Sequence, residues 1–228
     1  LQSLAGWDQA ANMPPKGSEA RAAAMAEMSA LLHRMRTDAA FGRRIDEAEQ
    51  EPLSELQRAN LREIRRGWDA DTALPESLVQ RRALATARCE HAWRTQRPAN
   101  DWAGFVENFR AVLAIGREQA TLLADKTGSS RYEALMDQYE PGLQCAQVDH
   151  VFGEVRQWLP GLIQQVLERQ RQRPLVEPVG PFPVAAQRAL CDRVMRLLGF
   201  DFEAGRLDVS THPFCGGVPE DVRMTTRF

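Results

Sequence analysis

Apolar side chains recur at the spacing of an α-helix through most of this chain. One such stripe runs over residues 102–123 and another over residues 151–167. Residues three and four positions apart lie on one face of a helix, so each stripe predicts an amphipathic helix whose apolar face belongs to a core. Gly128 lies just past the first stripe, as is typical of a helix end, and Pro160 predicts a kink in the second helix.

Weaker signals of the same kind extend the helical pattern to most of the remaining chain. The expected segments are a helix through Gln9 that ends near Met13, a helix from a capping Ser18 to about Arg36, helices over residues 53–68 and 75–97, and a last helix from Pro183 to Gly199.

The pattern changes from helical to alternating after Gly205. Leu207 and Val209 fall on one side of the chain, and Asp208 and Ser210 fall on the other. Successive side chains of a β-strand point to opposite faces, so this alternation predicts a strand with one apolar and one polar face.

Residues 221–228 alternate in the same way. Asp221, Arg223, Thr225 and Arg227 share one face, and the residues on the other face are mostly apolar. We expect an edge strand whose polar face lines a wet cleft and whose apolar face lies on a core. An exposed edge of this kind can pair with an extended peptide.

These patterns predict a mainly α protein, in which an antiparallel array of helices is followed by a small, incomplete β-sheet. Residues 1–173 make up the helical region, residues 174–183 a Pro-rich hinge or loop, and residues 184–228 a helix and the start of the sheet. We expect these parts to form one incomplete domain.

Composition argues against several classes of protein. The 31 acidic residues outweigh 29 basic ones and leave a net charge of −2, whereas nucleic-acid binding favours a basic surplus on one face. No apolar run approaches the ~20 residues that cross a bilayer, and the first residues lack the pattern of a signal peptide. The four cysteines are far apart, which favours reduced thiols in a cytoplasmic protein.

His212 lies in an expected turn, because the following Pro213 favours extended backbone and Phe214 can anchor the far side. A fixed imidazole can donate a hydrogen bond to a developing oxyanion, or support a metal ligand. The residues alone favour a simpler turn in which the imidazole bonds a backbone carbonyl. A zinc site on His212 and Cys215 would lack a second pair of ligands.

Four blocks of sequence point together to one enzyme family. They are Trp7-Asp8-Gln9, the stretch from Met13 to Arg21, the stretch from Tyr132 to Gly142, and a last block made of His212-Pro213-Phe214 and Asp221-x-Arg223-x-Thr225. In this order they resemble the carboxypeptidase Taq family, a group of zinc-dependent metallocarboxypeptidases. The blocks cover nearly the whole chain, so the resemblance does not depend on one motif.

The resemblance implies that the parent protein removes single amino acids from the carboxyl end of peptides. Two histidines and a glutamate would hold zinc, and the glutamate of a His-Glu-x-x-His helix would act as general base. That helix is expected beyond Phe228, and Leu1 is not a methionine, so we expect a fragment of a longer protein. Alone, the fragment is expected to be inactive, with no catalytic or metal-binding residue and no bound cofactor.

The resemblance also implies a substrate-binding wall made of His212, Asp221, Arg223 and Thr225. Arg223 can grip a terminal carboxylate with two parallel bonds, or it can pair with Asp221 and brace the strand, which is slightly favoured. The expected partners are peptide substrates and a second subunit in a homodimer. An alternative from a different class is a non-catalytic helical interaction module.

Overall fold

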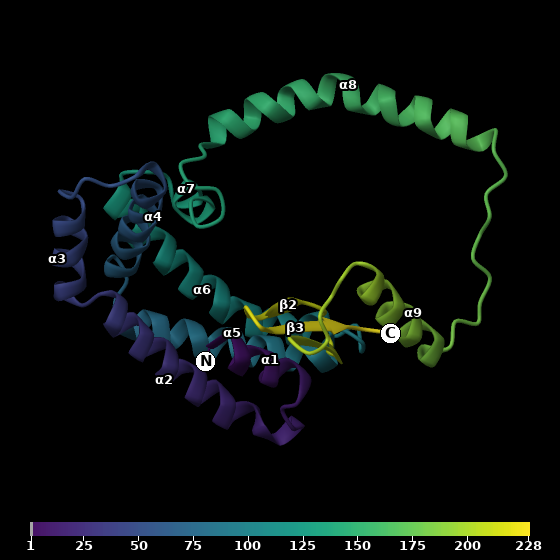
Figure 1. The fold of residues 1–228 in the computed structure, drawn as a ribbon, viewed down its shortest axis with the longest axis horizontal. Coiled ribbons are helices and arrows are strands. Elements are labelled where there is room, and N and C mark those ends of the chain that lie inside the picture. The colour runs from purple at the N-terminus through teal and green to yellow at the C-terminus, as the bar shows by residue number, and fades with distance from the viewer. Residues whose placement is uncertain (1) are drawn as a thin grey trace.

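Helices make up most of the computed structural model, which describes residues 2–228 (Figure 1). Within those residues the α-helices are α1 (Gln2–Ala11), α2 (Ser18–Arg36), α3 (Ala39–Ala48), α4 (Glu55–Thr72), α5 (Glu76–Gln96), α6 (Trp102–Thr127), α7 (Arg131–Met136), α8 (Cys145–Arg171) and α9 (Val184–Leu197). A short 3₁₀ turn, η1 (Pro15–Gly17), precedes α2. The strands are β1 (Gly205–Val209), β2 (Cys215–Val218) and β3 (Asp221–Thr226). The predicted fold class, a mainly α array followed by a small sheet, is confirmed.

Local side chains define several helix boundaries. Ser54 and Gln57 form a reciprocal capping box at the start of α4, which satisfies backbone N–H groups that have no partner inside the helix. Gly128 ends α6 in the left-handed region at φ +71°, as its position after the apolar stripe predicts. The helix α3 was not predicted, although Asp38 caps it by accepting a hydrogen bond from the Ala40 N–H.

The start of α2 differs from the prediction. Ser18 is the first helical residue rather than the cap, and no side chain caps this end. The reason lies in η1, because the 3₁₀ turn that begins at Pro15 runs directly into the helix. Ser18 therefore already has helical angles, φ −58° and ψ −46°, instead of the extended backbone of a capping residue.

The best-buried contact between helices joins α2 and α5. Ala22, Ala26 and Ala30 are buried on one face of α2, and Leu78 and Cys89 are buried on α5. Alanines four residues apart lie above one another on a helix, and their small side chains let two helix backbones approach closely. A second cluster joins α6 to α7, where Leu123 and Ala124 pack with Ala134.

The apolar stripe of α8 is not part of a core within residues 2–228. No residue of α8 is buried, and large apolar side chains such as Phe152, Trp158 and Leu162 are exposed. Figure 1 shows α8 as a long arc set apart from the other helices, continuous through Pro160 and joined to α9 by a segment without regular structure. The pattern correctly predicted an amphipathic helix, but periodicity does not specify what covers its apolar face.

The stripe of α6 is buried only in part. Its buried residues lie in the second half of the helix, whereas Phe109 and Leu113 are exposed. The side chains of α6 are buried where another helix contacts them, and within the described chain only α5 and α7 pack extensively along α6. The role of the Pro-rich stretch 174–183 as a hinge stays a prediction.

The sheet has the strand order β1–β3–β2, so β3 is the central strand and not the predicted edge. β3 runs parallel to β1 and antiparallel to β2. The strand β2 was not predicted, because its Gly216-Gly217 pair is typical of a turn. Gly217 has φ +93°, and a Cβ there would lie 2.2 Å from the Asp221 carbonyl oxygen, so the close pairing of β2 with β3 requires glycine.

Within residues 2–228, none of the helices combines the length and the apolar content that a bilayer crossing requires.

We predict that Gly42→Ala destabilises the protein by about 1–3 kcal/mol, because overpacking a filled site forces neighbouring atoms to move. A Cβ at Gly42 of α3 would lie 2.6 Å from Cζ2 of Trp68 on α4. Gly116→Ala on α6 is the matched control, since a Cβ there meets no atom of the described chain within 4 Å. Because alanine favours helix over glycine, this control is expected to be neutral or stabilising. Equal melting temperatures for the two variants would contradict the packing described for α3 and α4.

Candidate functional site

The polar face of the sheet lies against helix α1, and Trp7 makes the central contact. The indole Nε1 of Trp7 donates a hydrogen bond to Asp208 Oδ2 at 3.0 Å. The Arg223 guanidinium lies over the Trp7 ring, 4.2 Å from its centroid, in a cation–π contact. On the opposite, mostly apolar face, Val222, Met224 and Thr226 of β3 are half-buried and Val209 of β1 is 52% exposed, so the expectation that this face lies on a core stays a prediction.

Two arginine–aspartate pairs flank Trp7. Arg206 donates from Nε and Nη2 to the two carboxylate oxygens of Asp208, at 2.8 and 2.6 Å. Arg223 donates in the same way to Asp221, at 2.5 and 2.9 Å. The register of β1 and β3 places Arg206 beside Arg223. The pairing of Arg223 with Asp221 agrees with the bracing role that the strand pattern favoured.

Arg206 and Asp208 were not predicted to be members of this cluster. The available signal was the same arginine and aspartate spacing of two residues that marks Asp221 and Arg223. Residues two apart in a strand share a face, so a charged pair at this spacing can form side by side.

The arginines favour the ionised form of both aspartates. Hydrogen bonding from Arg223 lowers the pKa of Asp221. Burial acts to raise the pKa of Asp208, but the bonds from Arg206 and Trp7 outweigh it and leave that pKa lowered as well. A carboxylate with a lowered pKa in the folded state stabilises the fold above its unfolded pKa. This contribution is lost as the pH falls through the lowered value.

Thr225 holds the loop that carries His212. Thr225 is 5% exposed, and its Oγ1 accepts a hydrogen bond from the Phe214 N–H at 2.9 Å and donates to the Phe214 carbonyl at 3.2 Å. The Oγ of Ser210 lies 2.8 Å from both Thr225 Oγ1 and the His212 carbonyl oxygen. These bonds occupy the Thr225 hydroxyl and join the loop to β1 and β3.

The imidazole of His212 is exposed and packs edge-on against Trp93 of α5, with ring centroids 6.0 Å apart. Both rings border a cavity of about 650 Å³ between α1, α5, α6 and the loop, and Phe105, Phe109 and Phe214 supply much of its apolar lining. The imidazole is thus accessible at the rim of an apolar pocket.

The four predicted site residues fall into two groups. Ser210 links the His212 backbone to Thr225 at the loop, whereas Asp221 and Arg223 pair near the start of β3, where Arg223 lies against Trp7. Whether these residues bind substrate stays a prediction.

The donor set of the described residues does not fit a metal site. Nowhere in 2–228 do three or more histidine, cysteine, aspartate or glutamate side chains come together as metal ligands require. Cys215 is a free thiol near the His212 loop, and the other three cysteines are also unpaired. No chemical step involving zinc can therefore be derived from these residues.

We predict that Thr225→Val destabilises the protein by about 1–3 kcal/mol, because it removes the buried Thr225 hydroxyl and leaves the partly buried Phe214 N–H without its partner, while keeping a β-branched shape. Thr226→Val, one residue further on β3, is the control and is expected to change stability by less than about 0.5 kcal/mol. Chemical denaturation would measure both. A Thr225→Val variant as stable as the control would show that these bonds do not hold the loop.

Comparisons with known proteins give one consistent family. The family model described as Carboxypeptidase Taq (M32) metallopeptidase matches residues 1–228. Thermostable carboxypeptidase 1 of Thermus thermophilus is 36% identical over 100% of this chain and 47% of its own length. Carboxypeptidase 1 of Bacillus subtilis is 25% identical over 99% of this chain and 45% of its own length.

Solved structures agree with these relatives. Trypanosoma cruzi metallocarboxypeptidase 1 superimposes with a TM-score of 0.80 at 46% identity, over 100% of this chain and 46% of that chain. The BsuCP crystal structure gives a TM-score of 0.86 at 25% identity, with the same coverage of 100% and 46%. The chain spans about half the length of the relatives it matches. The predicted resemblance is confirmed, and the chain belongs to the carboxypeptidase Taq (M32) family of metallopeptidases.

Proposed function

We propose that this chain is part of a zinc-dependent metallocarboxypeptidase that removes single amino acids from the carboxyl end of peptides. The observation that carries the proposal is the family match over residues 1–228, together with 36% identity to a relative named as a carboxypeptidase. The proposal concerns the whole enzyme, of which these residues correspond to about half by comparison with the relatives.

The zinc ligands and the general base are proposed to lie outside these 228 residues. Support comes from the donor set, because residues 2–228 contain no group of three candidate ligands. Without a metal and a base, nothing polarises the scissile carbonyl or activates a water molecule. The isolated chain is therefore proposed to be inactive.

His212, Asp221, Arg223 and Thr225 are proposed to form part of the wall that faces the substrate, with different roles. His212 is proposed to contact the peptide, and its exposed imidazole beside an apolar cavity supports this. Arg223 is proposed to brace the strand, since both carboxylate oxygens of Asp221 already bind it and Trp7 covers its planar face. Thr225 is proposed to act through the loop, because it is buried.

We predict that the purified 228-residue chain releases no amino acid from unblocked peptides when zinc is added. Amino-acid analysis after incubation would measure release, and Thermus thermophilus thermostable carboxypeptidase 1, assayed alongside, would show that the assay detects activity. Release above the rate of a zinc-only blank would contradict the proposed division of the active site. An inactive chain is also expected of a helical interaction module, so the same assay on the complete natural protein separates the two: only a peptidase releases amino acids there.

A further inference from the structure

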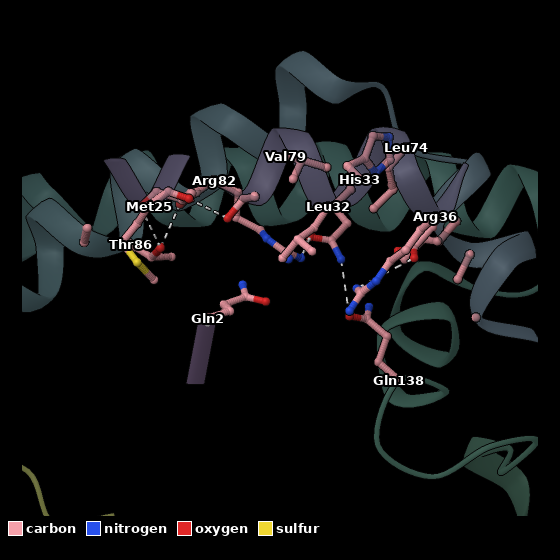
Figure 2. Close-up of a pocket in the computed structure, with 18 of the residues that line it drawn as sticks. Gln2, Met25, Leu32, His33, Arg36, Leu74, Val79, Arg82, Thr86 and Gln138 are labelled. Atoms are coloured by element: carbon pink, nitrogen blue, oxygen red, sulfur yellow. Dashed lines mark hydrogen bonds and ion pairs between the residues drawn. The ribbon is translucent and has the colours of Figure 1, made fainter. Parts of the chain in front are cut away.

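A second cavity, of about 710 Å³, lies where α2, α4, α5, α6 and α7 meet (Figure 2). Its apolar lining includes Leu32, Leu74, Val79 and Leu123, and polar side chains surround this floor. Gln2 projects from the first turn of α1 and faces the α2 and α5 side chains across the opening (Figure 2). A volume of several hundred cubic ångströms is within the range of small-ligand sites.

The polar lining suits a peptide. Four glutamine amides line the cavity, from Gln2, Gln9, Gln119 and Gln138. A primary amide both donates and accepts hydrogen bonds, so it can pair with the N–H and C=O groups of a peptide backbone. The apolar lining can take a side chain, while the exposed amides of Gln2 and Gln138 can pair with the backbone.

Three arginines, Arg36, Arg66 and Arg82, line this cavity together with three carboxylates, so the lining has no net charge, but its charges are not all paired with one another. Three carboxylates line it, and each has an arginine partner: Asp71 lies 3.9 Å from Arg36, Asp137 lies 3.4 Å from Arg66, and Glu90 lies 2.8 Å from Arg94. Arg82 also lines the cavity, but no carboxylate of residues 2–228 pairs with it. Arg82, whose side chain is exposed, is therefore the arginine of this lining that has no carboxylate partner within the described residues.

A neutral amide holds Arg82 in position. Its Nη1 donates to Gln119 Oε1 at 2.9 Å, and Gln119 is 5% exposed. The Gln119 amide in turn donates to Gln138 Oε1 at 3.3 Å. Because the guanidinium has five N–H groups and one of them is used here, the others remain for a planar acceptor. Figure 2 shows Arg82 and Gln138 at the same opening.

We propose that this cavity binds a carboxylate of a peptide, with Arg82 as the group that receives it. A carboxylate accepts two parallel bonds from a guanidinium, and the amides then align with the adjoining backbone. The inference rests on the proposed function in so far as peptides are the proposed substrates of the whole enzyme. The carboxylate can belong to the end of the peptide or to an acidic side chain.

The test is a direct binding measurement on the 228-residue chain without zinc. A fluorescently labelled pentapeptide with a central glutamate and a free carboxyl end is titrated, followed by versions with a glutamine in place of glutamate or with an amidated end. The peptide that lacks the carboxylate bound by Arg82 is expected to bind about tenfold more weakly or worse. A loss with the glutamine version identifies the side chain as the bound group, and a loss with the amidated version identifies the carboxyl end.

Arg82→Gln is expected to weaken binding of the parent peptide by about tenfold or more and to abolish the difference between the acid and amide peptides. Arg82→Lys keeps the charge without the planar fork and is expected to give a smaller loss. Arg81→Gln is the matched control, because Arg81 is the preceding residue of α5, pairs with Glu118 at 2.6 Å and does not line the cavity. It removes the same charge and is expected to change affinity less than about twofold.

Three outcomes would overturn the proposal: no binding at millimolar peptide, equal losses for Arg81→Gln and Arg82→Gln, or unchanged discrimination between acid and amide peptides in a folded Arg82→Gln variant. Circular dichroism melts establish that each variant is folded. Since no hydrolysis is measured, a negative result here leaves the metallocarboxypeptidase proposal standing, and an inactive complete enzyme would leave the binding result standing.

Discussion

The contact of Trp7 with the polar face of the sheet holds the candidate site together. Its indole donates a hydrogen bond to Asp208 and provides a π-surface for Arg223, so one side chain on α1 joins two adjacent strands. A partly buried cation over a tryptophan and a charge-assisted hydrogen bond are each among the stronger polar contacts of proteins. Helix α1 has no buried residue of its own, so its position depends on contacts of this kind.

The position of α1 matters because it borders both cavities. Gly6 and Ala10 line the apolar cavity beside His212, and Gln2 and Gln9 line the polar cavity around Arg82. A second hydrogen bond, from the Gln9 side-chain amide to Glu90, joins the same helix to α5. A change in the position of α1 would therefore alter both proposed peptide-binding surfaces. One is the apolar cavity beside His212, and the other is the more polar cavity around Arg82.

Much of the fold was predictable because its signals are local. Ser54 caps α4 together with Gln57, three residues further on, and Gly128 ends α6 because its backbone adopts the left-handed conformation. Each of these interactions lies within a few residues of sequence. The strand β2 was missed because it has only four residues, and α3 was missed although it is as long as α1, with ten residues. In β2, moreover, Gly217 fits a turn as well as the close strand pairing that the structure contains.

The sequence alone determined that residues 221–226 form a strand with a polar and an apolar face, that α8 is amphipathic, and that four blocks match one enzyme family. These properties follow from periodicity and residue type, which need no knowledge of neighbours. Only the tertiary structure decided that α1 packs on the polar face of the sheet, that β3 is central, and that Arg82 lacks a carboxylate partner within the described residues. These features depend on groups that come from distant parts of the chain, such as Trp7 and Asp208, and a local sequence pattern does not predict such a contact.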